Sequence, residues 1–385
     1  MKMNKIVLLG CVMTATITVW GQDKIGYSAL QVSGKPILYK EEKVLFRNAD
    51  TLHFGATLTL PLEVNTIGEN KKNGKSRKLI PAVILVSGTG PQDRDGTMAG
   101  HKLFATLANY LGSRGIAVLR MDDRGVGETN GVYETSTTAD FAEDALTAVA
   151  YLRSRTDLPL GKIGLMGHSE GGAAISIAAS RSQEVDFLIS LAGLATDGLS
   201  SLLRQNEDLV TAAPIPDYDK RRFNEINRLM FCTAYQYAQS DSLETMLNQV
   251  YSEWKVKDDL YFESLNVGEF DHFRFPIYMY TQQAIGPWYR FFVRYNPQLY
   301  LNKVRVPVLA LNGDRDVMVD CFQNLGHFKE FLTESTDVTT VALPGLNHLF
   351  LPCKKGTPDE YASIQASFSE DALKIIFEWI EKRFL

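Results

Sequence analysis

A serine with the neighbours of a hydrolytic nucleophile stands at position 169. Residues 162–176 read KIGLMGHSEGGAAIS, and Gly167 to Gly171 form the pattern Gly-x-Ser-x-Gly. An apolar strand pattern precedes the serine and a small-residue helix pattern follows it, which is the setting that a nucleophile elbow requires. The glycines leave room for a strained turn at the N-terminus of the helix. We therefore predict Ser169 as a nucleophile, the alternative being a serine that only caps a helix.

A serine attacks a carbonyl only when a base accepts its proton, and a nucleophile elbow goes with the chain order serine, acid, histidine. Two histidines fall in the later α/β pattern, His327 and His348. His327 lies in a predicted helix, whereas His348 lies in the loop PGLNH after the strand pattern VTTVAL. A strand-end loop presents a base, so we predict His348. We expect His53, His101 and His272 to be structural or surface residues.

The acid is expected in the loop after the strand pattern VLALNG, where Asp314 and Asp316 both occur. Gly313 and Asp316 match the Gly-x-x-Asp pattern that is usual at this place in α/β hydrolases. We predict Asp316 as the acid that orients His348, and Asp314 as part of a turn or of a salt bridge with Arg315. The D-x-D spacing lacks the glycine and the terminal glutamate of a calcium loop, so no metal site is expected.

Attack on a carbonyl builds negative charge on its oxygen, which two backbone N–H groups must stabilise. One should come from Glu170, the residue after the nucleophile. The other should come from the loop Ser-Gly-Thr-Gly at 87–90, where we predict Thr89, with Gly90 as the alternative. The charged stretch 91–96 should brace this loop, and a direct contact of Arg94 with substrate stays open as the second interpretation.

These residues need a parallel sheet to bring them together. From Pro81 onward, short apolar β-branched runs alternate with amphipathic helical patterns, which indicates an α/β fold with helices on both faces of the sheet. The stretch from Glu42 to Leu62 alternates apolar and polar residues around a turn and predicts an antiparallel strand pair. We expect a β segment at 22–79 and the α/β core in two parts, 80–197 and 303–385.

The strand pattern is interrupted between the two parts of the core. Residues 198–302 carry helical spacing and many aromatic side chains, which predicts a helical cap inserted above the nucleophile. We expect Trp288 and Tyr289 to contact the substrate, because ligand pockets are mostly apolar. The alternative is that the cap aromatics only pack the cap against the core. The aromatics considered are Phe275, Tyr278, Tyr280, Trp288, Tyr289, Phe291 and Phe292.

The first 21 residues have the pattern of a secretory signal, with Lys2 and Lys5 ahead of a short apolar stretch. We expect cleavage after Gly21 and a periplasmic or secreted protein, with a lipoprotein anchored through Cys11 as the alternative. Three cysteines would then remain, an odd number without C-x-x-C spacing. Cys321 and Cys353 are either bridged or, as the simpler interpretation, both unpaired.

Composition excludes several classes of function. The chain of 385 residues is 45% hydrophobic and 22% charged, as in globular proteins, and its net charge is -5. Attraction to nucleic acid or to an anionic membrane is therefore not expected. After the predicted signal, we expect no membrane span, and the oligomeric state stays open.

Five motifs together resemble one family. They are LVSGTGPQDRDG, LRMDDRGVGETNG, GHSEGG, PVLALNGDRD and LPGLNHLF. The chain from about Glu42 onward resembles the bacterial α/β-hydrolase esterases of the EstD type, which are grouped with serine aminopeptidase-like hydrolases. The resemblance implies an α/β-hydrolase fold with a helical cap, no cofactor, and hydrolysis of small to medium acyl esters by Ser169, Asp316 and His348. It also suggests a structural role for Asp122, Asp123 and Arg124, in a charged turn.

Other functions on the same fold stay open. A serine peptidase or amidase needs the same triad with a site for a charged terminus, and a thioesterase or acyltransferase differs in the acceptor that reaches the acyl-enzyme. A catalytically silent binding protein belongs to another class. The complete set of serine, acid and histidine argues against it.

Overall fold

The computed structural model describes residues 39–49, 51–62, 79–268 and 270–385. The predicted signal segment, with Cys11 and Gly21, lies outside these residues. Within the described residues, no helix combines the length and the apolarity that crossing a bilayer requires.

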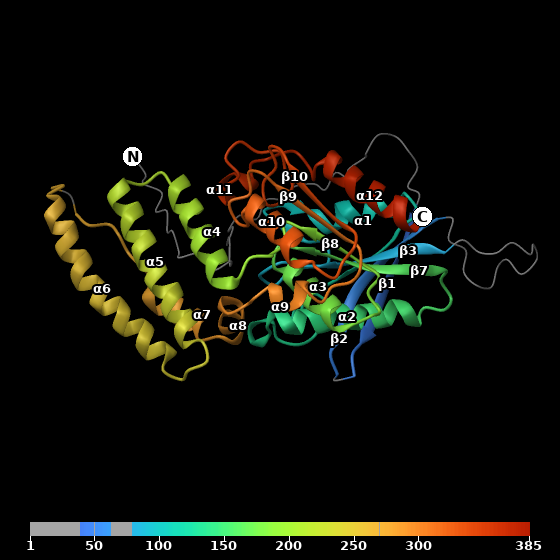
Figure 1. The fold of residues 1–385 in the computed structure, drawn as a ribbon, viewed down its shortest axis with the longest axis horizontal. Helices are drawn as coiled ribbons and strands as arrows, with labels where there is room; N and C mark the ends of the chain where they lie inside the picture. The colour runs from blue at the N-terminus through green and yellow to red at the C-terminus, as the bar shows by residue number, and fades with distance from the viewer. Residues whose placement is uncertain (1–38, 50, 63–78, 269) are drawn as a thin grey trace, which may run out of the picture.

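An eight-stranded sheet forms the centre of the molecule, with the strand order β1-β2-β6-β3-β7-β8-β9-β10 (Figure 1). The strands from β6 to β10 in that order run parallel, whereas β1 pairs antiparallel with β2, and β2 with β6. The strands are β1 (Tyr39–Arg47), β2 (His53–Pro61), β3 (Ile80–Val86), β6 (Ala117–Met121), β7 (Leu160–His168), β8 (Phe187–Leu191), β9 (Val308–Gly313) and β10 (Val338–Leu343). The mostly parallel sheet predicted from the sequence is thus confirmed.

Strands β1 and β2 form the antiparallel pair that the alternating pattern predicts. Phe46 stands opposite Phe54 in the register, and their rings lie 5.4 Å apart between centroids. Such cross-strand aromatic pairs stabilise an edge hairpin. A short second pair, β4 (Thr97–Met98) and β5 (His101–Lys102), lies outside the main sheet.

Helices cover both faces of the sheet, which explains why its central strands are apolar along their whole length. In β3 every residue is buried: Ala82 and Ile84 belong to one side of the core, and Val83 and Leu85 to the other. One face packs against α2 (Thr138–Ser154), α3 (Glu170–Arg181) and α10 (Cys321–Phe331), the other against α1 (Leu103–Gly112) and α12 (Glu370–Phe384). The short helices η1 (Tyr133–Thr135) and α11 (Pro358–Tyr361) lie in connections.

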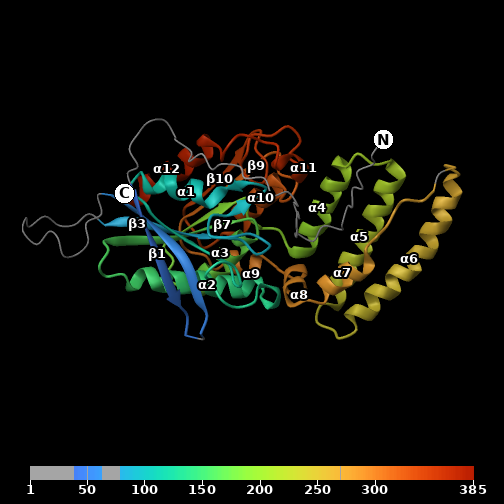
Figure 2. The ribbon, with the colours of Figure 1, turned by 180° about the vertical axis from the view of Figure 1, so that it is seen from behind.

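Between β8 and β9 the chain forms a run of helices, most of which stand beyond one end of the sheet, while the last and shortest, α9 (Gln298–Leu301), lies against α3 (Figures 1 and 2). We call this run the cap. It comprises α4 (Gly198–Ala212), α5 (Asp217–Tyr237), α6 (Leu243–Leu265), α7 (Ile277–Ala284), α8 (Pro287–Val293) and α9 (Gln298–Leu301). Its aromatic side chains, with Tyr280 and Phe292 among them, join the same hydrophobic core as α2 and α3.

The parallel register brings the carboxyl ends of β3, β7, β9 and β10 to one edge of the sheet. In open α/β sheets, ligands bind at this edge. The segments that follow these strands contain Thr89, Ser169, Asp316 and His348. The strand order thus brings together residues that are far apart in the chain, such as Thr89 and His348, which are separated by 259 positions.

Candidate active site

Ser169 lies in a sharp turn between β7 and α3. Its backbone has φ 56° and ψ -123°, a conformation that L-residues adopt only under strain, and the residue is 3% exposed. The turn is tight: a Cβ atom placed on Gly167 would lie 2.2 Å from the carbonyl oxygen of Gly171. The glycines of the motif therefore permit the nucleophile elbow, which holds Ser169 at the start of a helix.

Asp316 and His348 are in direct contact. The Nδ1 atom of His348 lies 2.8 Å from Oδ2 of Asp316, and both residues are buried. The second carboxylate oxygen, Oδ1, accepts the backbone N–H groups of Met318 at 2.8 Å and Val319 at 2.9 Å. The carboxylate is thus fixed from one side by its own loop, and it holds the imidazole from the other. Nδ1 donates to Asp316, which leaves Nε2 as the basic atom of the ring.

The loop that carries His348 is held by two buried side chains. Oδ1 of Asn347 accepts the backbone N–H groups of Leu349 and Leu351, each at 3.0 Å. Nε2 of His168 lies 2.9 Å from the carbonyl oxygen of His348, and the two imidazole centroids are 4.7 Å apart. A carbonyl only accepts, so His168 carries its proton on Nε2. Burial lowers the pKa of His168 to about 3, which keeps it neutral.

His168 is a residue that the sequence reasoning did not single out. It occupies the first variable position of the Gly-x-Ser-x-Gly pattern, immediately before Ser169. Its contact places the His348 ring beside the nucleophile elbow. The sequence signal for it is a histidine inside the motif itself, ahead of the later loops in which a catalytic base is expected.

The loop after β3 approaches Ser169 closely. A Cβ atom placed on Gly88 would lie 2.9 Å from Cβ of Ser169. The hydroxyl of Thr89 donates to Oε2 of Glu170 at 2.6 Å, and the N–H of Gly90 donates to the hydroxyl of Tyr133 at 2.6 Å. The Gly90 amide is thus engaged by Tyr133, and Thr89 stays the predicted oxyanion donor.

The base of the same loop is held by Asp123. Its two carboxylate oxygens accept the Ser87 hydroxyl at 2.5 Å and the Gln92 backbone N–H at 2.8 Å. Burial raises the pKa of Asp123 to about 7, and the negative charges of Asp144 and Glu170 act in the same direction. Asp123 thus braces the loop, as the resemblance suggested for this charged turn.

Arg94 also has a structural partner. Its guanidinium donates to both carboxylate oxygens of Asp122 and to Glu128 at 2.7 Å. Hydrogen bonds to Asp122 raise the pKa of Arg94. Of the two interpretations of Arg94, bracing is the one that these contacts favour.

The other aspartate of the acid loop has a turn contact. Asp314 accepts the N–H of Gly345 at 2.7 Å, so it belongs to a turn, while Arg315 donates to the carbonyl of Lys354.

The two cap residues expected to contact substrate have different surroundings. Trp288 is half-buried, and its indole N–H donates to Oε1 of Glu170 at 2.8 Å. Tyr289 is 1% exposed, and its hydroxyl pairs with that of Tyr280 at 2.8 Å. Trp288 therefore reaches the nucleophile elbow, whereas Tyr289 packs inside the cap. Tyr278 points outward and is 74% exposed.

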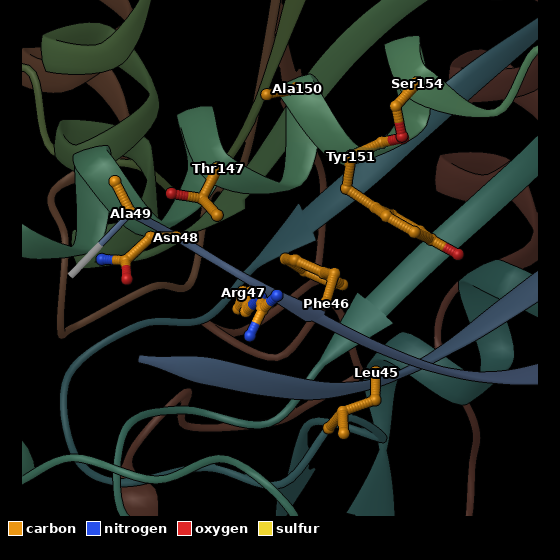
Figure 3. Close-up of a pocket in the computed structure, with 9 residues that line it drawn as sticks. All are labelled: Leu45, Phe46, Arg47, Asn48, Ala49, Thr147, Ala150, Tyr151 and Ser154. Carbon is orange, nitrogen blue, oxygen red and sulfur yellow. The ribbon is translucent and has the colours of Figure 1, made fainter. Parts of the chain in front are cut away.

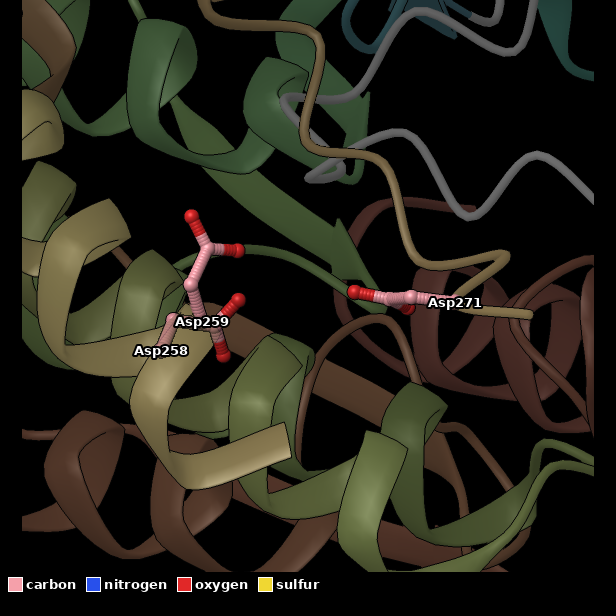
Figure 4. A group of neighbouring side chains, drawn as sticks. All are labelled: Asp258, Asp259 and Asp271. Atoms are coloured by element: carbon pink, nitrogen blue, oxygen red, sulfur yellow. The ribbon is translucent and has the colours of Figure 1, made fainter. Parts of the chain in front are cut away.

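An acidic cluster in the cap has a cation of its own. The carboxylates of Asp258, Asp259 and Asp271 lie close together (Figure 4). The buried guanidinium of Arg222 donates to both oxygens of Asp258 at 2.7 Å each and to those of Asp271 at 2.9 and 2.7 Å. A fixed guanidinium bound to two of these carboxylates accounts for the cluster without a metal ion.

A surface pocket of about 560 Å³ lies between β1 and α2 (Figure 3). Its walls are the end of β1, the turn that follows it and one side of α2, with Phe46 and Tyr151 stacked 4.7 Å apart between centroids. Three strands separate β1 from β7 in the sheet. The pocket is therefore separate from the candidate active site.

The cysteines and the remaining histidines that the structure describes are not part of this site. Cys232, Cys321 and Cys353 are free thiols. Of the two predictions for Cys321 and Cys353, the structure therefore has the unpaired one. Nε2 of His101 lies 2.9 Å from the carbonyl of Tyr361. Nδ1 of His327, in α10 as predicted, lies 3.1 Å from the hydroxyl of Thr196, a structural contact.

Comparisons with solved structures agree on the fold. An esterase of Pyrococcus furiosus, Pf2001, superposes with a TM-score of 0.50 at 12% identity over 90% of this chain and 92% of its own. An acylaminoacyl peptidase of Pyrococcus horikoshii gives a TM-score of 0.50 at 16% identity, over 90% of this chain and 42% of its own. At such identities the likeness shows the α/β-hydrolase fold alone.

Sequence comparisons give the family. Esterase EstD of Thermotoga maritima is 38% identical over 103 residues, which are 27% of this chain and 24% of the length of that relative. The alignment thus spans only about a quarter of the relative. A model of the family described as serine aminopeptidase, S33, matches residues 96–352, from the loop ahead of α1 to the His348 loop. Because this match covers well over half of the chain and includes the elbow, the Asp316 loop and the His348 loop, the chain belongs to the serine aminopeptidase S33 family of α/β hydrolases.

Proposed function

We propose that the protein is an exported serine carboxylesterase that hydrolyses small to medium acyl esters. The observation that carries this proposal is the contact of Asp316 with His348 at 2.8 Å, next to a serine held in a strained turn. These are the groups that activate a hydroxyl for attack on a carbonyl. The name of one similar protein, Esterase EstD, is consistent with it.

The proposed reaction has two acyl-transfer steps. Nε2 of His348 removes the hydroxyl proton of Ser169, and Oγ forms a bond to the ester carbonyl carbon. The backbone N–H groups of Thr89 and Glu170 stabilise the oxyanion. When the C–O bond to the alcohol breaks, His348 gives its proton to the leaving oxygen. Water then attacks the acyl-enzyme, His348 takes a proton from the water and returns it to Ser169, and the acid leaves. Asp316 stabilises the imidazolium and does not take the proton.

Two carboxylates near the elbow already accept hydrogen bonds from the protein itself. This favours an ester substrate over a peptide with a free N-terminus. Binding of a substrate ammonium group requires an acceptor that faces it. Glu170 accepts hydrogen bonds from Thr89, Thr138 and Trp288, and Asp123 accepts them from Ser87 and Gln92. Both carboxylates are thus engaged by the protein itself. An uncharged acyl ester needs no such partner.

A parallel substrate screen tests this proposal. The protein would be assayed with p-nitrophenyl esters of increasing acyl length and with aminoacyl anilides, and labelled with a fluorophosphonate. We expect labelling and a preference for esters by at least tenfold in kcat/KM. A preference for the anilides would identify a peptidase instead. Absence of both turnover and labelling would remove the serine-hydrolase proposal.

Export is a proposal that rests on the first 21 residues of the sequence. N-terminal sequencing of the protein from fractionated cells tests it. We expect a mature chain that begins at Gln22 in the periplasm or the medium. A lipid-modified N-terminus at Cys11 would establish the lipoprotein alternative, and an uncleaved chain in the cytosol would contradict export.

A further inference from the structure

The side chain of Glu170 has no part in the reaction as written above, where only its backbone N–H is used. Glu170 is the first residue of α3 and follows the nucleophile directly, and it is 1% exposed. A carboxylate buried to this extent is costly unless hydrogen bonds compensate for the loss of water. Its partners therefore indicate what the side chain does.

Three neutral donors reach this carboxylate from three separate parts of the chain. The hydroxyl of Thr138, at the start of α2, donates to Oε1 at 2.6 Å, and the indole N–H of Trp288, in α8 of the cap, donates to the same oxygen at 2.8 Å. The hydroxyl of Thr89 donates to Oε2 at 2.6 Å. One carboxylate thus joins the core, the cap and the loop that approaches Ser169.

The Thr89 contact is the one with consequences for catalysis. Thr89 lies between Gly88 and Gly90, so within this tripeptide it alone has a side chain that can restrain the backbone. Gly90 adopts φ 93°, and Gly88 packs against Ser169. An oxyanion donor stabilises the transition state only when its N–H is held close to the required position. The hydrogen bond between Thr89 and Glu170 supplies such a restraint.

We propose that Glu170 is a positioning residue that makes the placement of the Thr89 amide depend on docking of the cap through Trp288. This inference rests on the proposed function, because it requires that the Thr89 N–H stabilises an oxyanion. The carboxylate transmits the restraint: Trp288 and Thr138 fix Oε1, and a carboxylate fixed at one oxygen presents the other to Thr89 in a single direction. A cap that is not docked leaves Glu170, and hence Thr89, less restrained.

A purely structural role for the same hydrogen bonds predicts different kinetics. Loss of packing lowers the melting temperature and leaves kcat of the folded enzyme unchanged. Loss of a substrate contact by Trp288 raises KM. Loss of oxyanion positioning lowers kcat without raising KM, because the affected interaction exists only in the transition state.

The experiment is a double-mutant cycle on the full chain with one p-nitrophenyl ester. Thr89→Val keeps the backbone N–H and removes only the hydroxyl, and Trp288→Phe keeps an aromatic ring and removes the N–H donor. We expect each to lower kcat about 10- to 100-fold, part of the roughly 100- to 1,000-fold effect of losing an oxyanion donor, with KM changed less than about twofold. Both substitutions act through one carboxylate. The loss of kcat in the double variant should therefore be no larger than that of the single variant with the larger loss.

Two further variants complete the test. Glu170→Gln should retain kcat within about tenfold, because its amide oxygen accepts from Thr138 and Trp288 while its amide nitrogen donates to the Thr89 hydroxyl. Glu170→Leu, which offers neither group, should match the loss of the double variant. Melting temperatures are measured for every variant, so that kcat is compared only between folded proteins.

The outcomes separate this inference from the function on which it rests. Multiplicative losses in the double variant, an effect of Trp288→Phe on KM alone, or a lower melting temperature with unchanged kcat would each overturn the inference while the wild-type enzyme still hydrolysed esters. A wild-type protein that neither hydrolyses any ester nor reacts with a fluorophosphonate would overturn both.

Discussion

The sheet edge around Ser169 and the cap are stabilised in different ways. At the sheet edge, short loops are fixed one residue at a time: Asn347 and His168 hold the His348 loop, and Asp123 holds the loop that leads to Thr89. In the cap, long helices pack through aromatic side chains and through the buried guanidinium of Arg222. We therefore expect catalytic geometry and cap stability to respond to separate sets of substitutions, except at Trp288, which joins the two regions through Glu170.

The largest effect should come from the nucleophile. Ser169→Ala should reduce kcat on the order of a millionfold and abolish fluorophosphonate labelling, because only binding and oxyanion contributions remain. The melting temperature should stay close to that of the wild type. Ser180→Ala is the matched control, since Ser180 is on the same helix and its hydroxyl donates only to the carbonyl of Ile177. Near-normal turnover by the Ser169 variant would remove the proposed mechanism.

The next effect separates two aspartates in one loop. Asp316→Asn should lower kcat about ten-thousandfold, because an amide no longer stabilises the imidazolium and favours the wrong tautomer. Asp314→Asn should cost less than tenfold, since Asp314 accepts the Gly345 N–H outside the triad. Steady-state kinetics with a p-nitrophenyl ester measures both. A larger loss at Asp314 would show that the acid had been assigned to the wrong residue.

A substitution in the cap should act on stability. Arg222→Met removes the cation and leaves the buried Asp258 and the partly buried Asp271 without a partner guanidinium, so the unfolding free energy should fall by about 3 to 5 kcal/mol. Fluorophosphonate should still label Ser169 in the folded fraction. Arg228→Met, on the same helix, breaks an exposed pair with Glu207 and should cost less than about 1 kcal/mol. Denaturant unfolding compares the two variants, and equal losses would contradict the distinction.

Substitutions of the adjacent residues Trp288 and Tyr289 should have different effects, the first on substrate specificity and the second on stability. Trp288→Ala should change the ratio of kcat/KM between short and long acyl esters by about tenfold, because the indole reaches the nucleophile elbow. Tyr289→Ala should lower the unfolding free energy by about 3 to 5 kcal/mol and leave the ratio unchanged, because the ring lies inside the cap. If Trp288→Ala left the acyl-length profile unchanged, substrate choice would belong to the loops of the core.

The smallest expected effect concerns pH. Burial raises the pKa of Asp123 to about 7 in the folded protein, so between about pH 4 and pH 7 the folded chain binds a proton there that the unfolded chain does not. This group therefore stabilises the fold at low pH, and its contribution falls as the pH rises through that window. Asp123→Asn should reduce the slope of unfolding free energy against pH. An unchanged slope would show that Asp123 does not titrate there.

Much of the candidate site could be predicted because its residues are marked by local sequence. Ser169 lies between a strand pattern and a helix pattern, and His348 and Asp316 follow apolar strands. A parallel sheet collects strand ends at one edge, so patterns that are local in sequence predicted neighbours that are distant in the chain. The side chains of Glu170 and His168 escaped this reasoning, since only their backbone or their place in a motif was considered. Their partners are Trp288 in the cap and the His348 carbonyl, and no local pattern relates these positions.

Local sequence is enough to predict the α/β class of the fold, the elbow at Ser169, the strand-end placement of Asp316 and His348, and the helical insertion. All of these follow from the period of apolar residues and from glycine, which act over a few neighbouring positions. Which side chains share a hydrogen bond depends instead on how the whole chain packs. Trp288 and Tyr289 are adjacent and both aromatic, yet one reaches Glu170 and the other is enclosed by the cap. The direction in which a helix faces its neighbours depends on packing of the whole chain, and the two residues therefore differ for a reason that their own sequence does not contain.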